Sequence, residues 1–125
     1  MNKKPIEFYT VEQGLIIKHK AETIELKDLQ NVVGGLIEPV YTDWSNELTI
    51  YANEEALNMN LEPNIFIKGN LIRGNIIIIG IDRETTEPKT CTVSISDIVA
   101  LLTLWQQEGQ ELIKDILNDR SNNHE

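Results

Sequence analysis

The chain of 125 residues is 41% hydrophobic and 25% charged, and its formal net charge is -9 at pH 7. These proportions are ordinary for a soluble globular domain and exclude a fully disordered chain. The acidic balance disfavours binding to a phosphate backbone, which requires clustered Lys and Arg side chains. We therefore expect no direct binding to duplex nucleic acid.

The length fits one domain, and we expect a single α+β domain over residues 1–120 with a polar tail at residues 121–125. No apolar run follows the first lysines, and the longest aliphatic run, Ile76 to Ile79, is too short to cross a bilayer. Cys91 is the single cysteine, so no internal disulfide can form. These features together predict a cytoplasmic protein that makes no membrane contact.

The N-terminal part predicts a β-hairpin followed by a short helix. Residues 6–10 and 15–18 are rich in aliphatic, aromatic and β-branched residues and flank a turn that contains a glycine. Apolar residues then recur at helical spacing over residues 27–33, and the pattern stops at Gly34-Gly35. Because glycine adopts the left-handed conformation at no steric cost, we expect Gly34 to end this helix with a positive φ.

The middle of the chain predicts two strands and a short helical turn. Residues 36–41 are extended in pattern, and Pro39 cannot donate a backbone hydrogen bond, which favours an edge strand or a bulge. Residues 47–51 form a second predicted strand. Asn53 is suited to cap a helical turn over residues 54–57.

The C-terminal part predicts the most buried strand and the main helix. Residues 75–81 are the most apolar stretch and predict the central strand, and residues 90–93 predict a last short strand. The main helix is expected to begin at Ser94 or Ser96. Gly109 is unfavourable inside a helix, so we expect either a bend or two helices meeting there. The mixed order of elements favours an α+β fold, a mainly antiparallel sheet with helices on one face and a C-terminal helix or helix pair.

No pattern of known catalytic mechanism occurs in the sequence. There is no phosphate-binding glycine loop, no nucleophile elbow and no zinc-protease motif. Adjacent acids such as Glu54-Glu55 are more commonly surface groups near a helix start than catalytic pairs. We therefore expect a protein that is not an enzyme, with no catalytic residue, metal or cofactor.

Glycine-rich and polar segments supply the candidates for binding. Gly34 and Gly35 allow close approach to the backbone, and Arg73 can pair with a carboxylate or a phosphate. The simpler interpretation of these segments is a helix cap and a β-turn. Trp44 lies in a polar loop, where it is either an interface anchor or folded over the core.

Five short motifs occur between Leu29 and Gly80. In chain order they are Leu29-Gln30, Val33-Gly34-Gly35-Leu36-Ile37-Glu38, Asn53-Glu54-Glu55, Pro63-Asn64, and Gly74-Asn75 followed by the aliphatic strand to Gly80. This set resembles a family of uncharacterised proteins of phages, plasmids and integrated elements known as domain of unknown function 3846. Ala56 departs from the family pattern, which has a glycine after Asn-Glu-Glu. The family has no established activity, so the resemblance implies a mobile genetic element as the setting and no mechanism.

If these motifs meet in space, their polar residues form an acidic rim. The candidate binding residues are Gly34, Gly35, Glu38, Trp44, Asn53, Glu54, Glu55, Arg73 and Asn75. We expect a non-enzymatic binding protein whose partner is a host protein, and the resemblance suggests inhibition of a host defence component. The alternative is a protein that binds or sequesters a nucleotide-like molecule near Gly34-Gly35 and Arg73.

The C-terminal helical region also predicts an association surface, because it carries more large apolar residues than the sheet is expected to cover. Its residues are Trp105, Leu112, Ile116 and Leu117. We expect the apolar stripes before and after Gly109 to point in different directions, which leaves one uncovered. A homodimer in which this helix meets its own copy is the common solution. The competing interpretation is that the whole helix packs on its own sheet.

Overall fold

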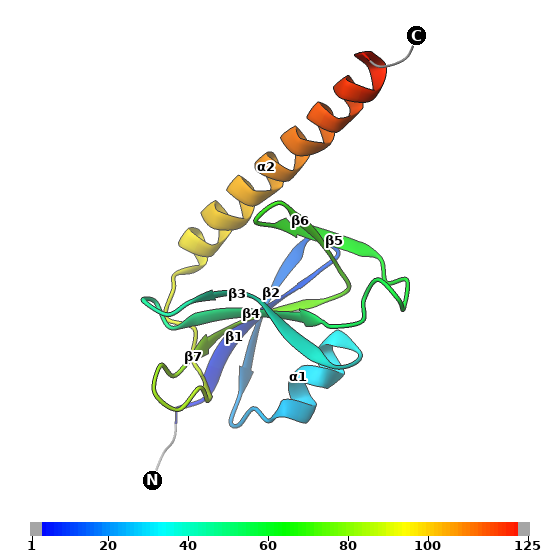
Figure 1. Ribbon diagram of the computed structural model, residues 1–125. Coiled ribbons are helices and arrows are strands. Elements are labelled where there is room, and N and C mark those ends of the chain that lie inside the picture. The colour runs from blue at the N-terminus through cyan, green and yellow to red at the C-terminus, as the bar shows by residue number, and fades with distance from the viewer. Residues whose placement is uncertain (1–3, 123–125) are drawn as a thin grey trace.

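The computed structural model describes residues 4–122, and the side chains of residues 4–119. The elements, in chain order, are β1 (Ile6–Glu12), β2 (Leu15–Ala21), α1 (Leu26–Val33), β3 (Ile37–Asp43), β4 (Leu48–Asn53), β5 (Pro63–Ile67), β6 (Asn70–Arg73), β7 (Ile76–Ile81), β8 (Pro88–Lys89) and α2 (Ile95–Asn122). They form an antiparallel main sheet, a separate β5–β6 hairpin and two helices (Figure 1). The fold is therefore α+β, as the sequence predicted. Neither helix combines the length and apolarity needed to span a membrane over the described residues.

The main sheet has the strand order β2-β1-β7-β4-β3, with β8 adding a short pairing to β7. The expected central position of β7 is confirmed, and all its residues are buried. Successive side chains of a strand point to opposite faces. Ile76 and Ile78 therefore face one side of the sheet, while Ile77 and Ile79 face the other. Since β7 is apolar on both sides, each face of the sheet requires its own cover.

The two helices provide these covers on opposite faces, whereas the sequence placed them on one. Leu29 and Val33 of α1 pack against Ile77 and Ile79. The other face is covered by α2 and the β5–β6 hairpin. The buried residues of this larger core are Val11, Leu48, Ile50, Ala52, Ile65, Ile67, Ile76, Ile78, Ile98, Leu102 and Trp105.

The N-terminal predictions are confirmed in detail. β1 and β2 pair along their full length. Gly34 ends α1 with φ 79°, and its N–H donates to the carbonyl oxygen of Gln30 at 2.8 Å. β3 lies at the edge of the sheet, and its register with β4 shifts between Pro39 and Tyr41, as expected for a proline that cannot join the ladder.

One strand assignment was wrong, and one hairpin was missed. Residues 90–93 form no strand, and the pairing with β7 comes instead from Pro88–Lys89. The β5–β6 hairpin was not predicted as a pair of strands. Its turn is Lys68-Gly69, and both residues have positive φ, 48° and 84°. Such a turn matches strand twist, but a Lys-Gly pair is a much weaker sequence signal than Asn-Gly or Asp-Gly.

α2 is one continuous helix, so the first of the two expected arrangements is present, but without the expected bend at Gly109, since Figure 1 shows none along it. The Ser94 hydroxyl accepts the N–H of Asp97 at 3.2 Å, which confirms the start near Ser94. Gly109 is retained for a tertiary reason: a Cβ atom there would collide with the ring of Phe66 in β5. The side chain of Gln106 also joins α2 to β5. Its amide accepts the Phe66 N–H at 2.7 Å and donates to the Phe66 carbonyl oxygen at 3.0 Å.

Candidate functional site

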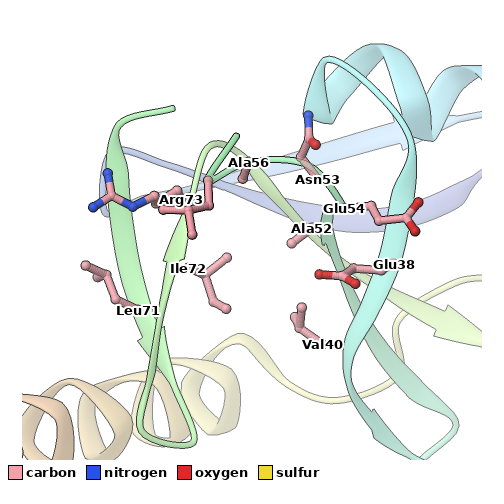
Figure 2. A pocket seen from close by; sticks show the side chains of 10 residues that line it. Glu38, Val40, Ala52, Asn53, Glu54, Ala56, Leu71, Ile72 and Arg73 are labelled. Carbon is pink, nitrogen blue, oxygen red and sulfur yellow. The ribbon is translucent and has the colours of Figure 1, made fainter. Parts of the chain in front are cut away.

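An open groove of about 210 Å³ lies beside the outer part of the sheet, where β3 and β4 face β6. It is lined by Glu38, Val40, Ala52, Asn53, Glu54, Ala56, Leu57, Leu71, Ile72 and Arg73 (Figure 2). The structure thus brings together four of the predicted binding residues, Glu38, Asn53, Glu54 and Arg73, from three separate segments of the chain. This groove is the candidate site.

The pairing of β3 with β4 explains why two acidic residues share one wall of the groove. Glu38 is directly opposite Ala52, so Glu54, two residues further along, is the diagonal neighbour of Glu38. The backbone fixes this arrangement, because the N–H of Glu54 donates to the carbonyl oxygen of Leu36 at 2.8 Å. Residues distant in sequence therefore present two like charges side by side.

Arg73 occupies the opposite wall. Its guanidinium donates to the carbonyl oxygen of Leu61 at 3.1 Å, and Figure 2 shows its side chain pointing away from both glutamates. Among the described residues, the ion pairs involve neither Glu38, Glu54 nor Arg73. The groove therefore offers charges of both signs to a ligand, on separate walls.

Apolar side chains lie between these walls and were not predicted as site residues. Val40 of β3, Ala52 of β4 and Ile72 of β6 line the groove and belong to, or pack against, the main core. The alternation of β3 was a signal for Val40, since residues two apart share one face. No comparable signal pointed to β6, because its position depends on the unpredicted hairpin.

Asn53 lines the groove but has its polar atoms engaged within the chain. Its Nδ2 donates to the carbonyl oxygen of Val33 at 3.0 Å, and its Oδ1 accepts the N–H of Glu55 at 2.7 Å. The residue is only 3% exposed. Gly35 is required beside it, because a Cβ there would lie 2.9 Å from the Asn53 Nδ2. Asn53 therefore caps the turn, as predicted, and also ties it to the end of α1.

Two further asparagines of the motifs make similar ties. The Nδ2 of Asn64 donates to the carbonyl oxygens of Val11 at 2.7 Å and Gly74 at 2.8 Å. The Nδ2 of Asn75 donates to the carboxylate of Glu12 at 3.2 Å and to the carbonyl oxygen of Val32 at 3.3 Å. These contacts join segments that are distant in sequence, which gives the asparagine motifs a structural explanation.

The expected rim is only partly formed. Glu55 and Asn75 do not line the groove. Asn75 and Gly34 instead line a second depression of about 280 Å³, whose described lining contains no Lys or Arg. Gly34 and Arg73 therefore face different hollows, and the glycine pair and the arginine do not share one ligand site.

The comparison with known families confirms the resemblance that the sequence motifs indicated. The family model described as Domain of unknown function (DUF3846) matches residues 6–103. The chain belongs to this family. The match spans every strand, the groove and the first part of α2, whereas the later part of α2 lies outside it. Searches of curated proteins and of solved structures gave no match.

The predicted association residues of this DUF3846 protein fall into two groups. Trp105 is 5% exposed and packs edge to face against Tyr41, with ring centroids 4.9 Å apart. It is thus a core residue and not part of an exposed surface. Leu112, Ile116 and Leu117 are 46%, 45% and 53% exposed and remain available for association.

Trp44, a predicted binding residue, and Cys91, the single cysteine of the sequence, both lie apart from the groove. Trp44 lies in the turn between β3 and β4, at the opposite end of β3 from Glu38, and it is 48% exposed. Its role as an interface anchor stays a prediction. Cys91 packs against the main core, and burial raises the pKa of its thiol. A raised thiol pKa disfavours the nucleophilic thiolate. No group of His, Cys, Asp and Glu within the described chain is arranged to hold a metal ion.

Proposed function

We propose that this DUF3846 protein is a non-enzymatic binding protein of a phage or another mobile genetic element, and that it binds a host protein in the host cytoplasm. The observation that carries the proposal is the pair of carboxylates, Glu38 and Glu54, beside an apolar floor and without an ion-pair partner among the described residues. Such a surface suits a long basic side chain of a partner.

The chemistry of the groove favours Lys or Arg as the group that enters it. Both side chains carry an aliphatic stem that covers apolar surface while the charged end remains polar. The stem would lie over Val40 and Ala52, and the cation would meet Glu38 and Glu54. Arg73 on the other wall suits an acidic residue of the same partner segment. The partner is thereby defined as a segment with charges of both signs.

A nucleic-acid-binding defence component is the kind of host protein that fits this proposal. Such proteins contact phosphates through Lys and Arg side chains. A protein of net charge -9 that binds those side chains would compete with nucleic acid for them. The proposed inhibition therefore follows from occupation of basic residues and needs no catalytic step.

The dimensions of the groove weigh against a nucleotide-like ligand. Small-molecule sites commonly measure about 300–1,000 Å³, whereas this groove measures about 210 Å³. The alternative also required the glycine pair and Arg73 at one site, but Gly34 lines the second depression, Arg73 lines the groove, and Gly35 lines neither.

The proposal is tested by tagged pull-down from host lysate with three forms of the full chain: wild type, Glu38→Gln/Glu54→Gln, and Glu84→Gln/Glu87→Gln. The control variant removes the same charge from an exposed loop outside the groove. We expect one host protein to be captured by the wild type and the control and lost from the groove variant. Equal capture by all three forms would contradict the groove as the binding surface. A nucleotide identified in the eluate would favour the alternative.

A further inference from the structure

The apolar stripe that packs α2 onto the sheet continues without a change of direction past Gly109. The residues of α2 that face the core are Ile98, Leu102, Trp105 and Gly109, spaced by four, three and four residues. Leu112 and Ile116 continue this spacing of three and four residues. Ile113 and Leu117, each one residue later, make the apolar stripe wider. Since an α-helix turns about 100° per residue, this spacing keeps all of them on one side. The expectation that the two stripes diverge is wrong.

The protein covers only the first part of this stripe. From residue 110 to residue 119 every described residue is exposed. Leu112, Ile113, Ile116 and Leu117 are 44–53% exposed, although they continue the buried face. Figure 1 shows this end of α2 extending clear of the sheet and of the β5–β6 hairpin. It also lies beyond the family match, which ends at residue 103. We call residues 110–119 the α2 extension.

One flank of the stripe is strongly acidic. Glu108, Glu111, Asp115 and Asp119 follow one another at steps of three and four residues, beside Leu112. The other flank carries Gln110 and Lys114, and the Lys114 ammonium makes an exposed ion pair with Glu111 at 3.6 Å. Asp115 and Asp119 take part in none of the ion pairs of the described residues. An occupant of the stripe would therefore meet carboxylates along one side only, and charge complementarity favours an occupant with basic residues along that side.

A second copy of the chain fits this surface poorly in either symmetric arrangement. An antiparallel pair sets each acidic flank against its own copy, which is repulsive. A parallel pair is blocked because each sheet lies on the stripe side of its helix, so the two sheets would require the same space.

We propose that the α2 extension docks an amphipathic basic helix of a partner protein. The partner helix would place apolar residues at i, i+3, i+4 and i+7 against Leu112 and Ile116, with Lys or Arg facing Asp115 and Asp119. The docked helix would prolong the packing that Ile98, Leu102 and Trp105 begin inside the domain. This surface is separate from the groove, so either proposal can fail while the other stands.

The test uses the full chain and two synthetic helical peptides with the same leucine pattern, one with Lys and one with Glu on the polar flank. Binding is measured by calorimetry at physiological salt against wild type, Leu112→Gln/Ile116→Gln, Asp115→Asn/Asp119→Asn and the loop control Glu84→Gln/Glu87→Gln. We expect the Lys peptide to bind the wild type and the loop control equally, and each of the other two variants at least about tenfold more weakly. Thermal unfolding verifies that each variant remains folded.

Three outcomes would overturn the proposal. The first is absent binding of the Lys peptide, or equal binding of the Glu peptide. The second is equal weakening by the flank variant and the loop control, which would indicate general charge attraction. The third is a dimer of the wild type in light scattering at tens of micromolar that Leu112→Gln/Ile116→Gln converts to a monomer. That result would make a second copy the occupant, as the sequence originally suggested.

Discussion

Gly109 of α2 lies against the aromatic ring of Phe66 in β5, at the last point where the helix is covered by its own domain. In an exposed helix, Gly→Ala stabilises by about 1 kcal/mol. Here the added methyl group would force the Phe66 ring aside, and overpacking costs about 1–3 kcal/mol. We expect Gly109→Ala to lower the free energy of unfolding, as measured by urea denaturation.

The control for this prediction is Gly109→Ala in a variant that lacks the Phe66 ring. In a Phe66→Ala background the steric cost is removed, so Gly109→Ala should raise stability by about 1 kcal/mol. A higher free energy of unfolding for Gly109→Ala in the wild-type background would contradict the prediction, because it would show that the Phe66 ring can move aside without destabilising the fold.

Gly34 supports a second stability prediction of a different origin. Its φ of 79° is strained for any residue with a Cβ, although nothing lies within 4 Å of the added atom. We expect Gly34→Ala to destabilise by about 1 kcal/mol, and the loss to be purely conformational. Asn31→Ala, at an exposed site of α1, serves as the control in the same melting experiment. Equal melting temperatures for wild type and Gly34→Ala would contradict the strain.

The carboxylate of Glu47 makes the stability of the protein depend on pH. Its carboxylate meets the Lys89 ammonium at 2.8 Å and accepts the N–H of Arg83 at 2.9 Å, and these contacts lower the pKa of Glu47. A lowered pKa in the folded state stabilises at neutral pH, and that contribution is lost as the pH falls through the folded pKa. We expect Glu47→Gln to be less stable than wild type at pH 7 and the difference to vanish in acid.

Urea denaturation over a series of pH values measures this effect, with Glu84→Gln as the control. A difference between wild type and Glu47→Gln that is independent of pH would show that the Glu47 charge is not responsible.

The acidic net charge also predicts that the protein does not bind duplex DNA. With a net charge of -9 and no cluster of Lys and Arg in the sequence, the purified protein should give no gel shift of duplex DNA at physiological salt. A shift at micromolar protein that persists on adding salt would contradict the expectation and would also weaken the proposed competition with nucleic acid.

Features determined by neighbours in the sequence were predictable. The apolar run of β7 and the helix end at Gly34 depend on local composition and conformation, and both were predicted correctly. The β5–β6 hairpin was missed because its Lys68-Gly69 turn carries a weak local signal. The periodicity of α2 indicated an apolar stripe, but only the folded sheet shows that Trp105 lies under cover while Leu112 does not.

The candidate site was predictable in part for the same reason. Glu38 and Glu54 come together because β3 pairs with β4 in a register that the sequence did not specify. The contact of Asn64 with Val11 joins positions 53 residues apart, so no local pattern could assign its role.

The amide of Gln106 takes the place of a neighbouring strand along the outer edge of β5, because it satisfies both the N–H and the carbonyl oxygen of Phe66. An unpaired strand edge is a template for aggregation between molecules. In the main sheet, Pro39 and the adjoining bulge interrupt the edge of β3. These two strands are therefore poor templates for pairing with another molecule, and the repulsion between chains of net charge -9 opposes contact at longer range.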